Sequence, residues 1–291
     1  MSIVHTTMPV TAADGVTSAL SVWLPPSPKT VMLFHAGLGV AAGYYRPFAE
    51  ALAAKGHAVA VMDPRGVGSS SVRPSRGVDF GYHELVALEI PAAWAVLRER
   101  FDGVPAVMGG HSLGAQLTVL AGPVLPPWVS GVVLVAAGSL FHRNWSGLAR
   151  WRVLVAGSVF PTLGRVFGRF PGKAVGFGGW EARTLMRDWG HCARTGRYRL
   201  HGSDRDWEAE ASTQTRPVLT ITMATDDWAP PVAMRHLVDK MPRAPVDRHH
   251  VQLDDGRGMA HFRWARDPER VVAVVDPWLH RLEDYSQTGA G

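Results

Sequence analysis

Cysteine is almost absent from this chain, because Cys192 is the one cysteine among 291 residues. A single thiol cannot build a disulfide framework, and it does not supply the several thiolates of a structural zinc site. We therefore expect no metal and no other cofactor, and we interpret Cys192 as a partly buried thiol without a redox role.

Long apolar runs are also missing. No segment approaches the ~18 consecutive apolar residues that are needed to span a bilayer. Residues 1–24 do not combine a basic start with an apolar stretch, as a secretory signal would. We expect a cytoplasmic protein with no stable membrane insertion.

Acidic residues are sparse in one region. Residues 140–216 contain 13 Lys and Arg but 6 Asp and Glu, together with 5 of the 11 tryptophans. Basic and aromatic residues can together bind nucleic acid or an anionic lipid surface. The charges are scattered, however, and no nucleic-acid-binding motif accompanies them. We therefore favour a solvated basic face over an aromatic-rich pocket, and we expect no nucleic acid partner.

Short apolar runs recur along the chain and are typical of buried strands in a parallel sheet. Helix-like segments lie between them at residues 45–55, 83–101 and 267–283. This alternation predicts an α/β fold with a mostly parallel sheet and helices on both faces. The period-two pattern within residues 3–24 predicts antiparallel strands at one edge. The strand-like runs are residues 30–35, 57–63, 104–109, 129–137, 217–223 and, more weakly, 246–253.

The alternation of strands and helices breaks between residues 140 and 216. Residues 160–179 contain Pro161, Pro171 and several glycines, which predicts loop or short helix there. We predict a core made of residues 1–139 and 217–291, with residues 140–216 inserted between two of its strands.

The sequence Gly110-His111-Ser112-Leu113-Gly114 fits the G-x-S-x-G pattern of a nucleophile elbow. A nucleophilic serine must project from a sharp turn between a strand and a helix, and glycines on both sides remove side-chain collisions at that turn. The pentapeptide is weak evidence alone, because glycine is common in this chain. A strand-like run before it and a small-residue helix after it make Ser112 the candidate nucleophile.

A serine nucleophile needs two backbone N–H groups that stabilise the developing oxyanion. Leu113 follows the nucleophile and is the first candidate. The second must come from the loop after an earlier strand, and we predict Gly37 in His35-Ala36-Gly37-Leu38-Gly39. The glycines of this loop, followed by Asp63, also approach a dinucleotide-binding pattern, but their spacing departs from G-x-G-x-x-G.

The acid and the base are expected after the serine in the chain. Two aspartates follow the run at residues 217–223, and we favour Asp226 over Asp227 because Asp226 lies four residues before Pro230. His261 lies between the last strand and the last helix, at the sheet edge where such sites form. We predict it to be the base, whereas His249 and His250 fall inside a strand and are interpreted as structural.

Together these features resemble the α/β-hydrolase superfamily over essentially the whole chain. Further segments resemble uncharacterised predicted hydrolases related to the serine aminopeptidase S33 and lysophospholipase-like families. The resemblance implies that residues 140–216 form a cap over the active site. The segments that carry it are His35–Gly37, Asp63–Gly68, Gly110–Gly114, Asp226 and His261, and then Tyr44–Ala49, Arg169–Lys173, Asp226–Trp228 and His261–Arg263.

We therefore hypothesise a serine hydrolase that cleaves an ester or other acyl bond of a small or lipid-like molecule through an acyl-enzyme. An acyltransferase with the same triad and a non-catalytic binding protein on this fold are the alternatives. Peptide, lipid, thioester and aromatic ester substrates all remain open, and the sequence does not predict an oligomeric state.

Overall fold

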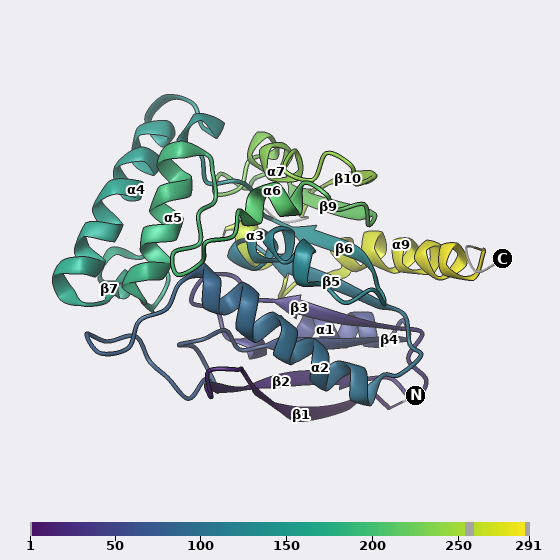
Figure 1. Ribbon diagram of the computed structural model, residues 1–291. Coiled ribbons are helices and arrows are strands. Elements are labelled where there is room, and N and C mark those ends of the chain that lie inside the picture. Colours follow the sequence, from purple (N-terminus) through teal and green to yellow (C-terminus); the bar gives the residue numbers. More distant parts are fainter. Residues whose placement is uncertain (1, 254–258, 289–291) are drawn as a thin grey trace.

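The computed structural model describes residues 2–253 and 259–288, with side chains as far as residue 282. Its centre is an eight-stranded sheet in the order β1-β2-β4-β3-β5-β6-β9-β10 (Figure 1). The first two strands pair antiparallel at one edge, and the other six strands of this sheet run parallel to one another. The predicted fold class is confirmed. The strands are β1 Val4–Thr11, β2 Thr17–Leu24, β3 Thr30–His35, β4 His57–Met62, β5 Ala106–His111, β6 Val129–Val135, β9 Val218–Met223 and β10 Val246–Val251.

Helices cover both faces of the sheet, and each face has its own apolar core. Helices α1 (Arg46–Ala53) and α9 (Glu269–Thr288) pack on one face, where Phe48 and Trp278 are buried. On the other face lie α2 (Ile90–Arg100), α3 (Leu113–Leu120) and α7 (Pro231–Val238). Strands β3, β4, β5 and β9 are buried along their whole length, as expected for a sheet that is covered on both sides.

One predicted helix differs in detail from the sequence pattern. The helix expected at residues 83–101 begins as a π-helical turn, Glu84–Glu89, before it continues as α2. Pro91 lies in the first turn of α2 and has no N–H to donate. The regular pattern of helical hydrogen bonds is therefore interrupted at Pro91, and the irregular turn lies directly before it. His249 and His250 both lie on the edge strand β10, as the pattern predicted, and both are exposed.

Residues 140–216 contain two long helices, and the first of them extends into residues 160–179, where loop or short helix was expected. Helix α4 (Gly147–Phe167) runs through Pro161 and packs along α5 (Arg183–Thr195), and Figure 1 shows the pair at one side of the sheet. Pro161 leaves the carbonyl oxygen of Gly157 without its usual helical donor. The guanidinium of Arg194, from α5, donates to that carbonyl. This contact between helices compensates for the proline, and a local sequence pattern cannot reveal it.

Cys192 on α5 is fully buried, not partly as predicted, and burial raises the pKa of its thiol.

The remaining short elements connect these parts. The short elements are η1 Ala42–Tyr45, η3 Gly122–Val124, η4 His142–Asn144, β7 Phe170–Pro171, η5 Gly172–Val175, β8 Trp180–Glu181, α6 Trp207–Ala211 and α8 Ala260–Arg263.

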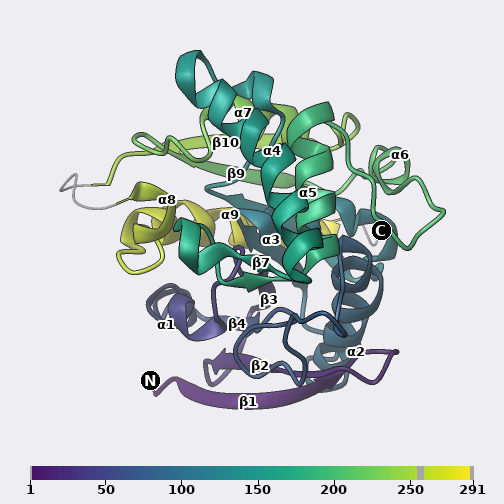
Figure 2. The ribbon, with the colours of Figure 1, turned by 90° about the vertical axis from the view of Figure 1, so that its left-hand side faces the viewer.

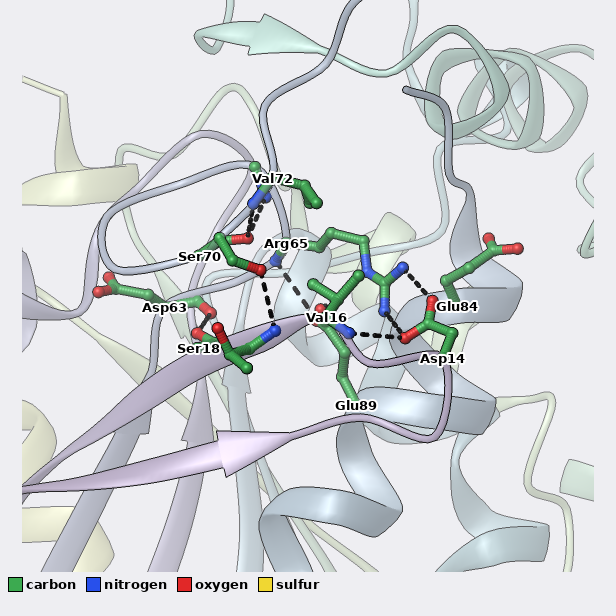
Figure 3. Close-up of polar contacts among 12 residues, drawn as sticks. Asp14, Val16, Ser18, Asp63, Arg65, Ser70, Val72, Glu84 and Glu89 are labelled. Carbon is green, nitrogen blue, oxygen red and sulfur yellow. Dashed lines mark hydrogen bonds and ion pairs between the residues drawn. The ribbon is translucent and has the colours of Figure 1, made fainter. Parts of the chain in front are cut away.

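The turn after β4 is held by a polar cluster (Figure 3). One oxygen of Asp63 accepts the N–H of Ala42 at 2.7 Å, and the other accepts the N–H of Ser69 at 2.9 Å. The buried Arg65 donates to Glu89 at 2.9 Å and to Asp14 at 2.6 Å. Both carboxylate oxygens of Asp63 therefore accept hydrogen bonds from the protein's own backbone. The interpretation of this aspartate as part of a dinucleotide-binding site has no support.

Candidate active site

Ser112 occupies the sharp turn between β5 and α3. Its φ is +54°, which is unusual for a residue with a side chain and costs roughly 1–3 kcal/mol. A Cβ on Gly110 would lie 2.3 Å from the backbone of Gly114, and a Cβ on Gly114 would lie 2.2 Å from the carbonyl oxygen of His35. Both flanking positions therefore admit glycine alone, which is the steric reason that the sequence pattern implied.

His261 and Asp226 lie next to Ser112 and form a chain of hydrogen bonds with it. His261 Nε2 is 3.0 Å from Ser112 Oγ, and His261 Nδ1 is 2.8 Å from Asp226 Oδ2. The other oxygen of Asp226 accepts the N–H groups of Trp228 and Ala229. Asp227 is exposed and makes no contact of this kind with His261 among the described residues. The three predicted residues are thus brought together, with Asp226 as the partner of the histidine.

The predicted oxyanion donors have different surroundings. The N–H of Leu113 belongs to the first residue of α3 and has no acceptor within the helix. The N–H of Gly37, by contrast, donates to the hydroxyl of Tyr45 at 2.8 Å and faces the protein interior. The next residue, Leu38, lines the same cavity as Ser112 and Leu113. The prediction for Gly37 is therefore corrected, because its N–H group is already used by Tyr45.

A buried pair, Tyr45 and His111, supports the turn from behind. Tyr45 Oη accepts the N–H of Gly37, which leaves its proton to be donated to His111 Nδ1 at 2.8 Å. Burial raises the pKa of Tyr45, and burial together with the neighbouring His261 ring holds the pKa of His111 well below its usual value. The His111 ring lies 4.8 Å from the His261 ring. The His261 ring thus packs against a neutral imidazole instead of a second cation.

A cavity of about 440 Å³ opens beside Ser112. Its wall combines the sheet edge with α4 and α5, and most of it is aliphatic or aromatic. Arg152 and Asp227 are the charged lining residues other than the triad histidine, among the residues that the structure describes. The apolar lining includes Leu38, Leu140, Val153, Phe160, Phe177 and Trp189.

Sequence reasoning missed several residues of the site. Trp228 lies with its ring 5.8 Å from the His261 ring and stacks on Phe177 at 5.7 Å, so it connects the base to the segment after α4. The hydroxyl of Tyr44 donates to the carbonyl of Phe262 and holds the histidine loop. The indole of Trp145 donates to the carbonyl of Asp227. Tyr44 and Trp228 stand within segments that carry the family resemblance, which is the signal that could have pointed to them, whereas Trp145 has no such signal.

One group of side chains away from the triad could hold a metal ion. Among the side chains that the structure describes, His57, Asp276 and His280 are the group whose ligand atoms all lie within 4.8 Å of one another. His57 is the first residue of β4, at the opposite end of the strand from the catalytic edge. Its Nε2 is 3.0 Å from Asp276, and its Nδ1 is 2.7 Å from the Thr30 hydroxyl.

None of the helices in the described parts of the chain is both long and apolar enough to cross a membrane. Ser112, His261 and Asp226 lie at the carboxyl edge of the sheet, with the serine on the strand-to-helix turn. Such an arrangement can transfer a proton from the serine to the histidine while the serine oxygen attacks an acyl carbon.

Comparisons with known proteins agree with the fold. The chain resembles a soluble variant of monoglyceride lipase from Saccharomyces cerevisiae, at a TM-score of 0.68 and 16% identity, over 95% of this chain and 96% of the other. It also resembles the esterase domain of a Rhodothermus marinus protein, at a TM-score of 0.62 and 18% identity, over 97% and 99%. An esterase from Pyrococcus furiosus matches at a TM-score of 0.61 and 15% identity, over 96% and 91%. No curated protein sequence matches this chain significantly.

The family comparison is the more specific result. The model of the serine aminopeptidase S33 family matches residues 26–252, which span β3 to β10 and include the serine elbow and both aspartates. His261 lies just beyond that match, on the short helix α8. The chain is therefore a hydrolase of the α/β-hydrolase fold, and it belongs to the serine aminopeptidase S33 family.

Proposed function

We propose that this protein is a serine esterase that cleaves substrates with an extended apolar acyl or alkyl group. The observation that carries the proposal is the apolar cavity of about 440 Å³ that opens beside Ser112. Burial of each methylene in such a cavity contributes about 0.8 kcal/mol, or roughly a fourfold gain in binding. The enzyme should therefore prefer esters whose chain fills the cavity.

Ser112 is the proposed nucleophile, and His261 is the proposed base. The hydroxyl proton passes to His261 Nε2 as Oγ bonds to the acyl carbon, and the carbonyl electron pair moves to its oxygen. Asp226 keeps the Nδ1 proton of His261 in place and stabilises the imidazolium. When the tetrahedral intermediate collapses, the alcohol leaves with the proton from His261. Water, activated by the same histidine, then releases the acid.

We assign the oxyanion donors to the N–H groups of Leu113 and Leu38. Leu38 replaces Gly37 in this role because it lines the cavity, whereas the N–H of Gly37 donates to Tyr45. In this scheme Tyr45 and His111 are positioning residues, since they fix the loop and the elbow without reaching the substrate. Each well-placed donor typically contributes 10²–10³-fold to the rate.

We further propose that residues 140–216 act as the cap that selects the substrate. Helix α4 supplies Val153, Ala156 and Phe160 to the cavity wall, and α5 supplies Trp189. The indole of Trp145 bonds to the loop that carries the acid, which ties the start of the cap to the triad.

A series of p-nitrophenyl esters from acetate to hexadecanoate tests this function. We expect kcat/KM to rise about fourfold for each added methylene until the cavity is filled, and then to level off. A flat series, or a preference for amino-acid p-nitroanilides over all of the esters, would contradict an apolar ester substrate. Addition of a primary alcohol separates hydrolysis from acyl transfer, because a transferase makes the new ester in preference to the free acid.

A further inference from the structure

Helix α4 has two apolar faces, although the proposed site uses only one. Its inner residues line the cavity and pack on α5. Its outer face carries a second set of large apolar side chains that are between 42% and 75% exposed. These are Leu148, Trp151, Val155, Val159 and Val166, and Phe167 follows them at 53% exposure.

These outer residues form one continuous stripe. They follow one another at intervals of three, four, four and seven residues, which keeps them on one side of a helix. From Leu148 to Val166 the stripe is about 27 Å long at 1.5 Å per residue. Figure 1 places α4 at the outer side of the molecule, and Figure 2, seen from that side, shows it beside α5. Contiguous exposed apolar surface of this kind marks an interaction site.

The charge of the segment indicates which surface would cover the stripe. Residues 103–180 contain no Asp or Glu at all, whereas α4 itself carries Arg150, Arg152 and Arg165, each of them exposed. A helix with an apolar face that includes tryptophan, and with arginines as its sole charges, lies well in the boundary layer of an anionic bilayer. Each arginine near such a surface adds about 1 kcal/mol of attraction.

We propose that the outer face of α4 docks on the surface of an anionic lipid bilayer. The helix lies flat on the bilayer, with its stripe among the acyl chains and with Arg152 and Arg165, which flank the stripe, at the phosphates. The stripe lies opposite Gly157 and Gly164, which pack on α5, and the cavity-lining residues lie between these two faces of the helix. Docking therefore brings the cavity within a helix diameter of the lipid. The use of this position to take substrate directly from the bilayer rests on the proposed function, whereas the docking itself does not.

The test is co-sedimentation of the full chain with sucrose-loaded vesicles. One set is phosphatidylcholine alone, and the other is an equimolar mixture with phosphatidylglycerol. The triple variant Leu148→Gln/Trp151→Gln/Val155→Gln removes the first part of the stripe without touching a cavity-lining residue. Val4→Gln/Val232→Gln is the matched control, because both valines are exposed but lie on β1 and α7.

We expect wild type and the control to bind the anionic vesicles and the triple variant to bind them on the order of 100-fold more weakly. Arg165→Gln, which removes a charge that flanks the stripe, should weaken binding to anionic vesicles roughly fivefold and leave binding to phosphatidylcholine unchanged. Hydrolysis of a soluble short-chain ester should stay unchanged in all of them, which shows that they fold. Ser112→Ala should bind vesicles as wild type does, so loss of the reaction and loss of docking are separable.

Equal binding by wild type and the triple variant would overturn the proposal, as would a wild type that binds neither kind of vesicle. Gel filtration distinguishes the other occupant of the stripe. If wild type is a dimer that the triple variant dissociates, and no vesicle binds, then a second copy of the chain covers this face instead of a bilayer.

Discussion

The carboxyl edge of the sheet and helix α4 both contribute to the wall of the cavity, but they differ in what fixes their shape. At the sheet edge the backbone leaves almost no freedom, because Ser112 has a positive φ and its flanking glycines touch other backbone atoms. On α4 the lining residues are ordinary helical side chains. We infer that the edge determines the reaction and that α4 determines the substrate. Substitutions at the edge should therefore abolish activity, whereas those on α4 should change specificity by degrees.

The largest effect should follow from Ser112→Ala. Removal of a nucleophile that acts together with a base lowers kcat by roughly 10⁴–10⁶-fold. Hydrolysis of a p-nitrophenyl ester measures the loss, and thermal unfolding should show that the variant remains folded. His261→Ala should cost about as much, and the double variant little more. Additive losses would show that the two residues do not act as a unit.

Gly114→Ala should be the next most damaging change. A Cβ there would lie 2.2 Å from the His35 carbonyl oxygen, so either β3 or the first turn of α3 must move. We expect a loss of roughly 2–4 kcal/mol in the free energy of unfolding. Gly43→Ala is the control, because a Cβ at Gly43 meets no atom within 4 Å. Chemical denaturation of both variants measures the difference, and equal stabilities would refute the steric account of the elbow.

Ala156→Phe tests the role of α4 in selecting the substrate. Ala156 lines the cavity, so a phenyl ring there should shorten the longest ester that fits. We expect kcat/KM for a dodecanoate ester to fall roughly 10- to 100-fold while that for acetate hardly changes. Ser158→Phe places the same ring on the exposed side of the helix and should have no such effect. A loss that is equal for both esters would argue against a cap that limits the length of the substrate's acyl chain.

A further effect concerns the pH dependence of stability at His35. Burial lowers the pKa of His35 from 6.5 to about 4. The unfolded chain therefore binds a proton at this residue below about pH 6.5, while the folded protein does not until about pH 4, so acid favours unfolding in that window. We expect His35→Leu to lose less stability than wild type between these pH values in urea titrations. Identical pH slopes would mean that His35 is not the neutral, buried group described here.

Much of the fold and of the candidate site could be predicted from the sequence, for physical reasons. The strands β3, β4 and β9 are buried on both faces, so they stand out as continuous apolar runs. The order of Ser112, Asp226 and His261 could be predicted because each follows a strand of a parallel sheet, and the ends of such strands meet at one edge.

The errors arose where distant residues decide local structure. The direction of the Gly37 N–H depends on how far the Tyr45 hydroxyl reaches, which spacing does not show. Helix α4 continues through Pro161 because Arg194, more than thirty residues later, donates to the freed carbonyl of Gly157. Both cases involve side chains that complete hydrogen bonds of backbone groups elsewhere in the chain, and the Arg194 contact explains why the full length of α4 could not be predicted.

The central claim is that Ser112 forms a covalent acyl-enzyme, and intact mass spectrometry with an alkyl fluorophosphonate tests it most directly. We predict one adduct per chain, on the peptide that contains Ser112, formed faster as the alkyl chain of the probe lengthens and lost in Ser112→Ala. No adduct on the wild type, or equal labelling of Ser112→Ala, would contradict the assignment of this serine as the nucleophile.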